Sequence, residues 1–347
     1  MNKKLKTENI LFVMTDGLRW QEVFGGADEA LMNKEDGGVQ NIDALKKTYW
    51  RSTPEARRET LMPFLWNTIV RQGQLYGNRN KGSEASVTSG KNFSYPGYSE
   101  TLCGYPDPRI DSNDNNPNPN VTVLEWLHNK PKYRGRIGAF GAWYVFTGIF
   151  NAARCGFPVN AAYAPFTDIP MTPQLELLNK LKAEMPRYWD GEPYDAITFY
   201  TALEYLKTKK PKVLFLSLGE TDEWAHAGNY KEYLDSARRV DDFLKRLWDT
   251  VQSMPQYRGK TTLIFLPDHG RGLAPKGWKG HGGGLPDSKY IWMGFLGPDT
   301  PALGERTNVA AVTQSQIAAT LAALLGEDYN AAEPKAGKVV VEALGKP

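Results

Sequence analysis

Cysteine is scarce in this chain, and so is net charge. Among the 347 residues there are only two cysteines, Cys103 and Cys155, which are compatible either with free thiols or with one disulfide. A disulfide framework is therefore excluded as the main source of stability, and a chain of this length can bury roughly three quarters of its unfolded surface without one. The formal net charge is only +3, so the sequence does not indicate a nucleic-acid-binding surface.

Long apolar runs are also missing. No run approaches the ~20 residues that a bilayer-spanning helix needs, so we expect no membrane segment. The apolar residues near the N-terminus, 10–14, form a stretch too short for the core of a secretory signal. The compartment stays open: we expect a periplasmic or secreted protein if a leader has been removed, and a cytoplasmic one otherwise.

Short, uniformly apolar runs alternate with longer mixed segments along the chain. The apolar runs predict strands at 9–15, 136–143, 212–218, 261–267 and 290–297. The longer segments predict helices at 61–72, 121–129, 173–184, 195–208, 230–253 and 310–325. Strands that are apolar throughout are covered on both faces, and strands that alternate with helices form parallel sheets. The sequence thus predicts an α/β fold with a mainly parallel β-sheet flanked by helices on both faces.

Two segments interrupt this alternation. Residues 104–120 are rich in Pro, Asn and Asp, and residues 144–172 are irregular as well. Loops of such length are usually either functional or disordered, and we expect both segments to be loop or cap insertions over the active site. We see no linker that would divide the chain, so we predict a single α/β domain over residues 1–347.

Histidine is rare too, and its four positions are informative. His128 lies near the C-terminal end of a predicted helix, where the helix dipole favours a cation, so we interpret it as structural. His226, His269 and His281 lie instead in predicted loops, beside acids or glycines. An imidazole in such a loop is a candidate metal ligand.

Acidic residues follow three of the predicted strands. Asp16, Asp222 and Asp268 each come just past the end of an apolar run. Because ligands of parallel sheets bind outside the carboxyl ends of the strands, we expect these carboxylates at one edge. Singly, each has a plain explanation, such as a turn for Asp16 or a helix N-cap for Asp222. Together they do not, because a tight group of carboxylates needs a compensating cation.

The order of the candidate ligands is more specific than any one of them. Along the chain it reads Asp, Asp-x3-His, Asp-His and His, namely Asp16, Asp222, His226, Asp268, His269 and His281. Three Asp and three His suffice for two divalent ions, and mixed nitrogen and oxygen ligation suits Zn²⁺, with Mn²⁺ as an alternative. We therefore predict two divalent metal ions per chain.

This order, on this topology, resembles the alkaline phosphatase superfamily over residues 16–281. The resemblance implies that one ion is held by Asp16, the nucleophile, Asp268 and His269. It implies that the other ion is held by Asp222, His226 and His281.

The stretch KNFSYPGYSETLCGYPD, residues 91–107, is similar to the nucleophile region of the nucleotide pyrophosphatase/phosphodiesterase branch. That pattern has a Thr or Ser, an aromatic residue and Pro, and later a Gly before a Pro-containing turn. The resemblance implies that Ser94 is the nucleophile and a ligand of the first ion, with Ser99 as the alternative. Pro96 and the helix-like residues after it would put Ser94 near a helix N-terminus, where backbone N–H groups bind anions. The structural alternative is that both serines cap that helix.

The same branch places an Asn downstream, where it binds a phosphoryl oxygen. Here the resemblance implies Asn113, with Asn115 as the second choice. Alkaline phosphatases proper use an Arg instead, which we do not place in this sequence. The sulfatase branch has Cys or Ser, x, Pro, x, Arg; this chain has Ser94 and Pro96 but Tyr98 in place of the Arg, and so departs from the sulfatase pattern.

The resemblance implies a two-metal hydrolase of phosphate esters. It would be a phosphodiesterase or phosphatase that acts on a small-molecule ester through a phosphoseryl intermediate. One alternative is a sulfatase or phosphonate hydrolase of the same superfamily. Another, from a different class, is a metal-dependent anion-binding module without catalysis. A retained nucleophile favours an enzyme, because binding alone does not need Ser94.

Overall fold

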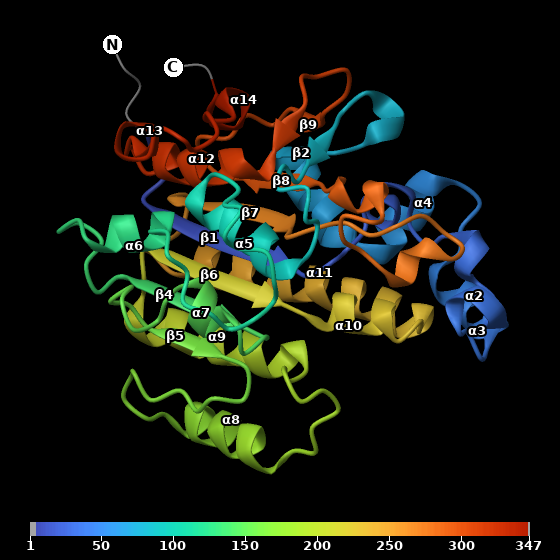
Figure 1. Cartoon of the computed structure of the whole chain (residues 1–347), viewed down its shortest axis with the longest axis horizontal. Coiled ribbons are helices and arrows are strands. Elements are labelled where there is room, and N and C mark those ends of the chain that lie inside the picture. The colour runs from blue at the N-terminus through green and yellow to red at the C-terminus, as the bar shows by residue number, and fades with distance from the viewer. Residues whose placement is uncertain (1–4, 346–347) are drawn as a thin grey trace.

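The computed structural model describes residues 5–345 of the chain. An eight-stranded sheet with the order β5-β4-β6-β1-β7-β8-β2-β9 runs through it (Figure 1). Its strands are β1 Asn9–Thr15, β2 Gln74–Tyr76, β4 Ile137–Gly141, β5 Val159–Ala161, β6 Val213–Leu218, β7 Thr261–Pro267, β8 Met293–Leu296 and β9 Gly304–Glu305. Strands β3 Ala85–Ser86 and β10 Val312–Thr313 form a separate parallel pair.

The central part of the sheet is parallel. β5, β4, β6, β1 and β7 all pair in parallel, whereas β8 runs antiparallel to both of its neighbours. The predicted mainly parallel α/β fold is therefore confirmed, and β8 is the exception within it.

Helices cover both faces of this sheet. The α-helices are α1 Trp20–Gly25, α2 Lys34–Gly37, α3 Ile42–Tyr49, α4 Pro54–Leu61, α5 Ser94–Cys103, α6 Val123–His128, α7 Phe146–Ile149, α8 Pro173–Glu184, α9 Asp195–Lys209, α10 Glu220–His226, α11 Tyr230–Ser253, α12 Ile317–Leu324, α13 Tyr329–Ala332 and α14 Val341–Leu344. A π-helical turn spans Leu65–Val70, and short 3-10 turns span Glu29–Leu31, Arg79–Lys81, Gly277–Lys279, Pro286–Lys289 and Gln314–Gln316.

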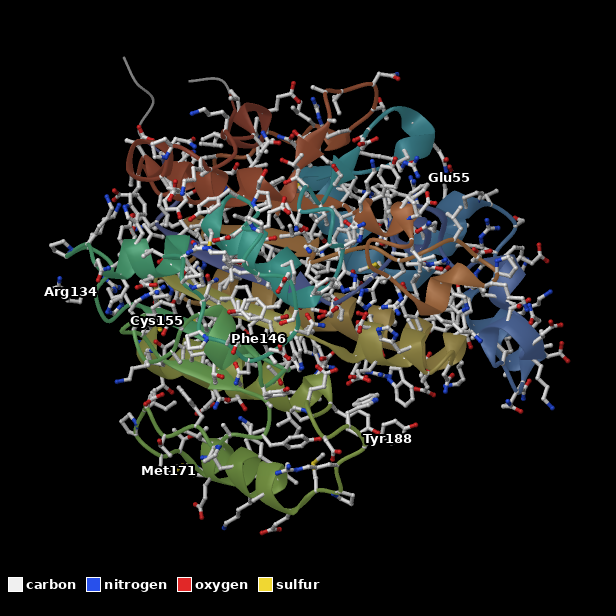
Figure 2. The ribbon with its side chains drawn as sticks, in the orientation of Figure 1. Glu55, Arg134, Phe146, Cys155, Met171 and Tyr188 are labelled. Carbon is white, nitrogen blue, oxygen red and sulfur yellow. The ribbon has the colours of Figure 1, made fainter. Side chains whose placement is uncertain are left out.

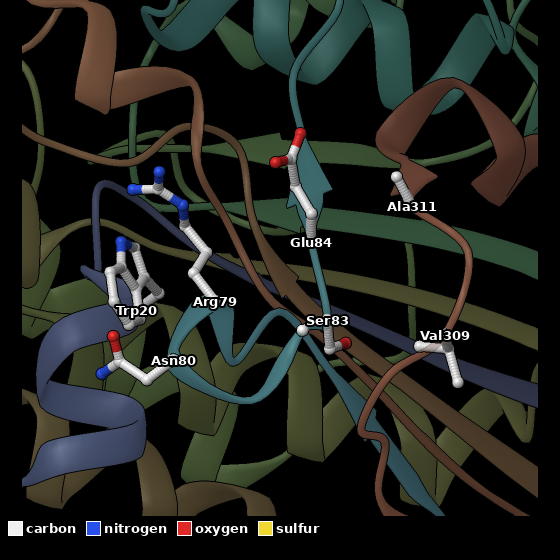
Figure 3. Close-up of a pocket in the computed structure, with 8 residues that line it drawn as sticks. Trp20, Arg79, Asn80, Ser83, Glu84, Val309 and Ala311 are labelled. Atoms are coloured by element: carbon white, nitrogen blue, oxygen red, sulfur yellow. The ribbon is translucent and has the colours of Figure 1, made fainter.

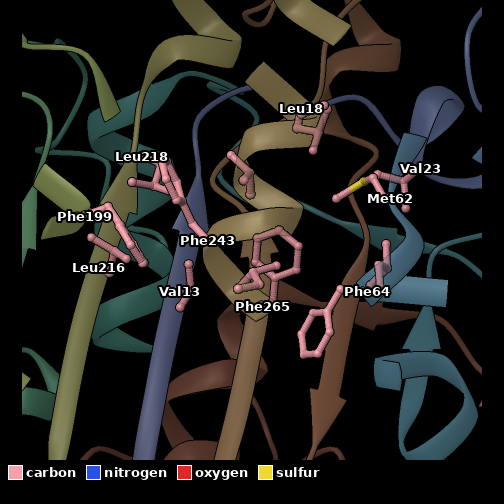
Figure 4. Close-up of a cluster of buried hydrophobic side chains, with 14 of the residues drawn as sticks. Val13, Leu18, Val23, Met62, Phe64, Phe199, Leu216, Leu218, Phe243 and Phe265 are labelled. Carbon is pink, nitrogen blue, oxygen red and sulfur yellow. The ribbon is translucent and has the colours of Figure 1, made fainter. Parts of the chain in front are cut away.

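Alternate residues of the central strands belong to two separate hydrophobic clusters. Leu11 and Val13 of β1 belong to the cluster that also contains residues of α1, α9 and α11, part of which Figure 4 shows. Phe12 and Met14 belong to the cluster with α5, α6, α7 and α12. Because both faces are buried, the strand sequences are apolar throughout instead of alternating with polar residues.

Some local predictions need correction. The helix predicted at 61–72 is present over 63–72, but its central part, Leu65–Val70, is π-helical and Leu61 belongs to α4. The helix predicted at 310–325 is β10, a 3-10 turn and α12. Residues 144–172 contain α7 and β5, and β5 is the edge strand of the sheet, so part of this segment lies in the sheet and not over it. Residues 104–120, all of them described, contain neither helix nor strand.

The interior and the periphery separate clearly. Phe146 lies among the buried residues, while Arg134 and Met171 lie at the rim of the view (Figure 2).

Cys103 and Cys155 are buried free thiols. Among the described residues, we find no helix with the length and apolar character needed to cross a membrane.

The packing around β6 leads to a test of the core. Phe215 is fully buried, with its ring centroid 5.3 Å from that of Phe12 and 5.0 Å from that of Phe150. We expect Phe215→Ala to lower the free energy of unfolding by about 3–5 kcal/mol, because it leaves a cavity at the centre of the sheet. Urea denaturation measures this. Leu177→Ala, at a side chain that is 58% exposed, should change it by less than about 0.5 kcal/mol, and equal effects of the two changes would contradict the packing.

Candidate active site

Three adjacent strands bring the predicted ligands to one edge of the sheet. Asp16 follows β1, and Asp268 and His269 follow β7 on one side of it. β6, on the other side, leads into α10, which carries Asp222 and His226. The prediction that His226 lies in a loop is wrong, because it lies on this helix together with Asp222. Their spacing of four residues puts both side chains on one helix face.

The first group of candidate ligands surrounds the ring of His269. Potential ligand atoms of Asp16, Asp268 and His269 lie within 4.8 Å of one another. His269 Nε2 is 3.2 Å from Asp16 Oδ1 and 3.4 Å from Asp268 Oδ2. His269 Nδ1 lies 2.8 Å from the carbonyl oxygen of Gly270. A carbonyl only accepts, so Nδ1 carries the proton and Nε2 presents its lone pair to this group.

The second group lies beside the first and shares His269 with it. Potential ligand atoms of Asp222, His269 and His281 lie within 4.8 Å of one another. His226 Nε2 is 3.1 Å from Asp222 Oδ2 and 3.0 Å from His281 Nε2. His281 Nδ1 donates to the carbonyl oxygen of Asn92 at 3.2 Å, which leaves its Nε2 facing the group. All six predicted Asp and His ligands therefore lie together.

Burial shapes the charges in this cluster. Burial, together with the nearby Asp222 carboxylate, raises the pKa of Asp16 to about 7, and burial with Asp16 raises the pKa of Asp268 well above its usual range. Burial also lowers the pKa of His269 to about 4 and that of His281 to about 3. These imidazoles are thus neutral at neutral pH, which is the form that binds metals.

Two carboxylate oxygens in the cluster lack what a buried oxygen needs. Within residues 5–345, Asp16 Oδ1 and Asp268 Oδ2 are buried and have no hydrogen-bond partner. Leaving such oxygens unpaired costs free energy, whereas a divalent cation would satisfy both of them. The residues present therefore fit a divalent metal, and their mixture of nitrogen and oxygen donors is one that Zn²⁺ accepts.

Ser94 is the first residue of α5 and lies next to the first group. Its Oγ is 3.4 Å from His269 Nε2, and its side chain is buried. A Cβ at Gly97 would lie 2.4 Å from the carbonyl oxygen of Asp268. Only glycine therefore lets the first turn of α5 pack this closely against the Asp-His segment.

The alternative nucleophile lies elsewhere. Ser99 is in the middle of α5, where its Oγ accepts from Asn118 Nδ2 at 3.2 Å and contacts Cys103 Sγ at 3.9 Å. The N-cap residue of α5 is Phe93, so neither serine caps the helix, contrary to the structural alternative.

The two candidate asparagines have different surroundings. Asn113 Oδ1 accepts the backbone N–H of Tyr95 at 3.0 Å, directly beside Ser94. From the sequence we expect N–H groups at this end of the helix to bind an anion, but this one is already bonded to Asn113. Asn115 bonds instead to Thr147 of α7 at 2.9 Å. The structure thus places Asn113 next to the predicted nucleophile and Asn115 away from it.

Two residues lie in the site to which the sequence analysis gave no role there. The buried hydroxyl of Tyr98 donates to Asp16 Oδ2 at 3.1 Å and lies 2.7 Å from Ser217 Oγ. Arg271, which is 1% exposed, donates to Asp222 Oδ1. The available signal for Arg271 was its position two residues after the Asp-His pair, and Tyr98 falls one helical turn after Ser94.

A separate pocket lies outside this cluster. It has a volume of about 500 Å³ and is lined by Trp20, Arg79, Glu84 and Val309 among others (Figure 3). None of its lining residues belongs to the two groups of candidate ligands.

The unpartnered oxygens lead to a metal-binding prediction. In Asp268→Asn, one oxygen remains to accept from the N–H groups of Gly17 and His269, which lie 3.1 and 2.8 Å from Asp268 Oδ1, and only the unpartnered oxygen is replaced. Zn²⁺ should raise the Tm of the metal-free wild type, since a ligand that binds the folded state stabilises it by about 2.7 kcal/mol at 100 times its Kd. We expect Asp268→Asn to lose much of this rise in a thermal-shift titration.

Asp249→Asn is the control, because it changes an exposed carboxylate on α11. It should respond to Zn²⁺ as the wild type does. A full Zn²⁺-dependent rise in Asp268→Asn would remove Asp268 from the ligand set.

Comparisons with known proteins agree with the overall fold. The Sulfatase family matches residues 8–327. The alkaline phosphatase PafA superposes with a TM-score of 0.60 and 9% identity over 99% of this chain and 100% of that one. A 2-O GAG sulfatase superposes with a TM-score of 0.58 and 14% identity over 97% of this chain and 74% of that one.

A curated relative matches over a shorter stretch. GPI ethanolamine phosphate transferase 1 of Mus musculus is 34% identical over 85 residues, which are 24% of this chain and 9% of that protein. The match thus spans less than a tenth of the relative's length. Because the family match covers residues 8–327, the chain belongs to the Sulfatase family, and its fold is that of structural neighbours such as the alkaline phosphatase PafA.

Proposed function

We propose that the protein is a hydrolase of phosphate esters, a phosphodiesterase or phosphatase that works with two divalent ions and uses Ser94 as its nucleophile. The observation that carries this proposal is the position of Ser94 Oγ, 3.4 Å from His269 Nε2. The same nitrogen lies beside the unpartnered oxygens of Asp16 and Asp268. A nucleophilic hydroxyl is thus next to the donor atoms that would hold an activating ion.

The proposed ligand sets differ from the two groups in two ways: Ser94 is added to the first, and His226 replaces the shared His269 in the second. Asp16, Ser94, Asp268 and His269 would hold one ion, and Asp222, His226 and His281 the other. Divalent ions in such a site lower the pKa of a bound hydroxyl and stabilise the oxygen of the leaving alcohol. Ser94 Oγ would form a bond to phosphorus as the bond from phosphorus to the alcohol oxygen breaks, and water would then cleave the phosphoserine and restore the hydroxyl.

Asn113 would orient the phosphoryl group. Its Oδ1 is held by the N–H of Tyr95, so its amide nitrogen, which makes no hydrogen bond within the described residues, is left to donate to a phosphoryl oxygen. The N–H of Tyr95 already donates to Asn113, and Pro96 has no N–H, so few backbone donors remain at the start of α5. We therefore assign the orienting role to this side chain and not to the helix terminus.

A specific feature favours phosphate over sulfate as the ester. In the sulfatase pattern an Arg stands two residues after the Pro, and this chain has Tyr98 there. Its neutral hydroxyl is engaged by Asp16 and Ser217, so it supplies no positive charge at that point. The match to the Sulfatase family favours the second candidate, a sulfatase or phosphonate hydrolase. The phosphate group in the name of the partial relative favours the first.

Ser94→Ala is the decisive substitution. Because it closes the covalent route, we expect turnover of an aryl phosphate ester to fall at least about 10³-fold. Ser99→Ala is the matched control, since it removes a buried hydroxyl from the same helix, and it should retain most of the activity. Mass spectrometry of wild-type protein quenched during turnover should show a phosphate adduct on Ser94. An adduct on Ser99, or full activity in Ser94→Ala, would contradict the assignment.

The two candidate reactions can be separated directly. With aryl phosphate monoesters, diesters and an aryl sulfate as substrates, we expect one of the phosphate esters to have the highest kcat/KM. The reason is the neutral Tyr98 where a sulfatase carries an Arg. Faster turnover of the sulfate would make the protein a sulfatase.

A further inference from the structure

Arg271 is a buried cation beside the candidate ligands that no part of the proposed mechanism uses. Its side chain is 1% exposed and all three of its nitrogens are engaged. Nε donates to the carbonyl oxygen of Trp278 at 2.7 Å, Nη2 donates to that of Lys279 at 2.6 Å, and Nη1 donates to Asp222 Oδ1. One guanidinium group thus joins the loop after β7, the turn at 277–279 and helix α10.

This turn leads directly to His281. Trp278 is fully buried and its indole N–H donates to the carbonyl oxygen of Asp36 at 3.0 Å. The N–H of Gly272 donates to the carbonyl oxygen of Gly280 at 3.0 Å. His281 is therefore the first residue after a segment whose backbone carbonyls are held by Arg271 and by Gly272.

The turn after β1 is shaped around the same ion pair. Gly17 has a φ of +58°, and a Cβ on it would lie 2.7 Å from Asp222 Oδ1 and 2.8 Å from Arg271 Nη1. The position thus requires glycine for two reasons, namely its backbone conformation and the lack of space for a side chain. Asp222 and Arg271 consequently pack against the residue that follows Asp16.

We propose that Arg271 is a positioning residue of the second ion site. It holds the segment that carries His281 against Asp222, so that Asp222, His226 and His281 are arranged before an ion arrives. The proposal rests on the proposed function, because it assumes that these three residues bind an ion. It extends that function by assigning the geometry of the second site to a residue that binds neither ion nor substrate.

A simpler role for Arg271 gives the opposite prediction. If Arg271 only neutralised Asp222, its removal would leave an unpaired carboxylate, which attracts a cation more strongly. If Arg271 positions the His281 segment, its removal weakens the second site despite that added attraction. The sign of the change in affinity therefore separates the two roles.

Calorimetric titration of the metal-free protein with Zn²⁺ measures this sign. We expect Arg271→Ala to weaken the second ion by about 10–100-fold, as the loss of a residue that orients metal ligands usually does, and to leave the first ion within a few-fold of the wild type. Arg271→Lys keeps the charge but not the fork that reaches two carbonyls, so its second site should also weaken, to a smaller extent. The lysine variant decides the question if the alanine variant does not fold.

Arg239→Ala is the matched control. Arg239 donates to Glu220, a second carboxylate of α10, and has no bond to the turn at 277–279. Its removal should leave both ions unchanged. Equal or tighter binding of the second ion in Arg271→Ala would overturn the proposal.

Hydrogen exchange of the metal-free protein tests the anchoring without any ion. Arg271→Ala should speed exchange at the N–H groups of Gly272 and Gly280, which bond to Gly280 and Gly277 in the wild type, and Arg239→Ala should not. Unchanged exchange in Arg271→Ala would overturn the proposal. If the wild type binds fewer than two ions, the proposed function fails, and faster exchange in Arg271→Ala would still support the anchoring of the His281 segment.

Discussion

The crowding of carboxylates at one sheet edge is the constraint to which the rest of the site responds. Asp16, Asp222 and Asp268 reach this edge because β6, β1 and β7 are parallel neighbours and end together. Like charges in a buried place repel, and burial alone penalises each of them. The surrounding residues reduce that cost: Tyr98 donates to one carboxylate and Arg271 to another.

The two carboxylate oxygens without a hydrogen-bond partner indicate where in the cluster an ion would bind. Asp16 Oδ1 and Asp268 Oδ2 both lie close to His269 Nε2. The proton of this ring is on Nδ1, which donates to a backbone carbonyl. Burial keeps this ring neutral, because it lowers the pKa of His269. A protein that only needed to balance its charges would gain from a protonated histidine here. A neutral one is useful when a metal supplies the charge.

Close backbone packing connects this edge to the helix that carries Ser94. Gly97 lets α5 approach the carbonyl of Asp268, and Gly17 leaves room for the pair of Asp222 and Arg271. Both glycines lie beside candidate ligands, at places where any side chain would collide with backbone or with the ion pair. The loop at 104–120 then adds Asn113 beside Ser94 through the N–H of Tyr95.

The sequence by itself determined the central strands of the sheet and the order of the candidate ligands. Apolar runs buried on both faces identify β1, β4, β6 and β7 because burial on two sides excludes polar residues, and acids that directly follow such runs must lie at the edge. It could not reveal which side chain meets which. That Ser94 approaches His269 while Ser99 bonds Asn118 depends on how α5 is rotated against β7. That Asp222 and His226 lie on a helix, that 159–161 joins the sheet, and that Arg271 reaches across to α10 also depend on contacts between segments far apart in the chain. Local patterns record burial and turns, whereas only tertiary packing decides these distances.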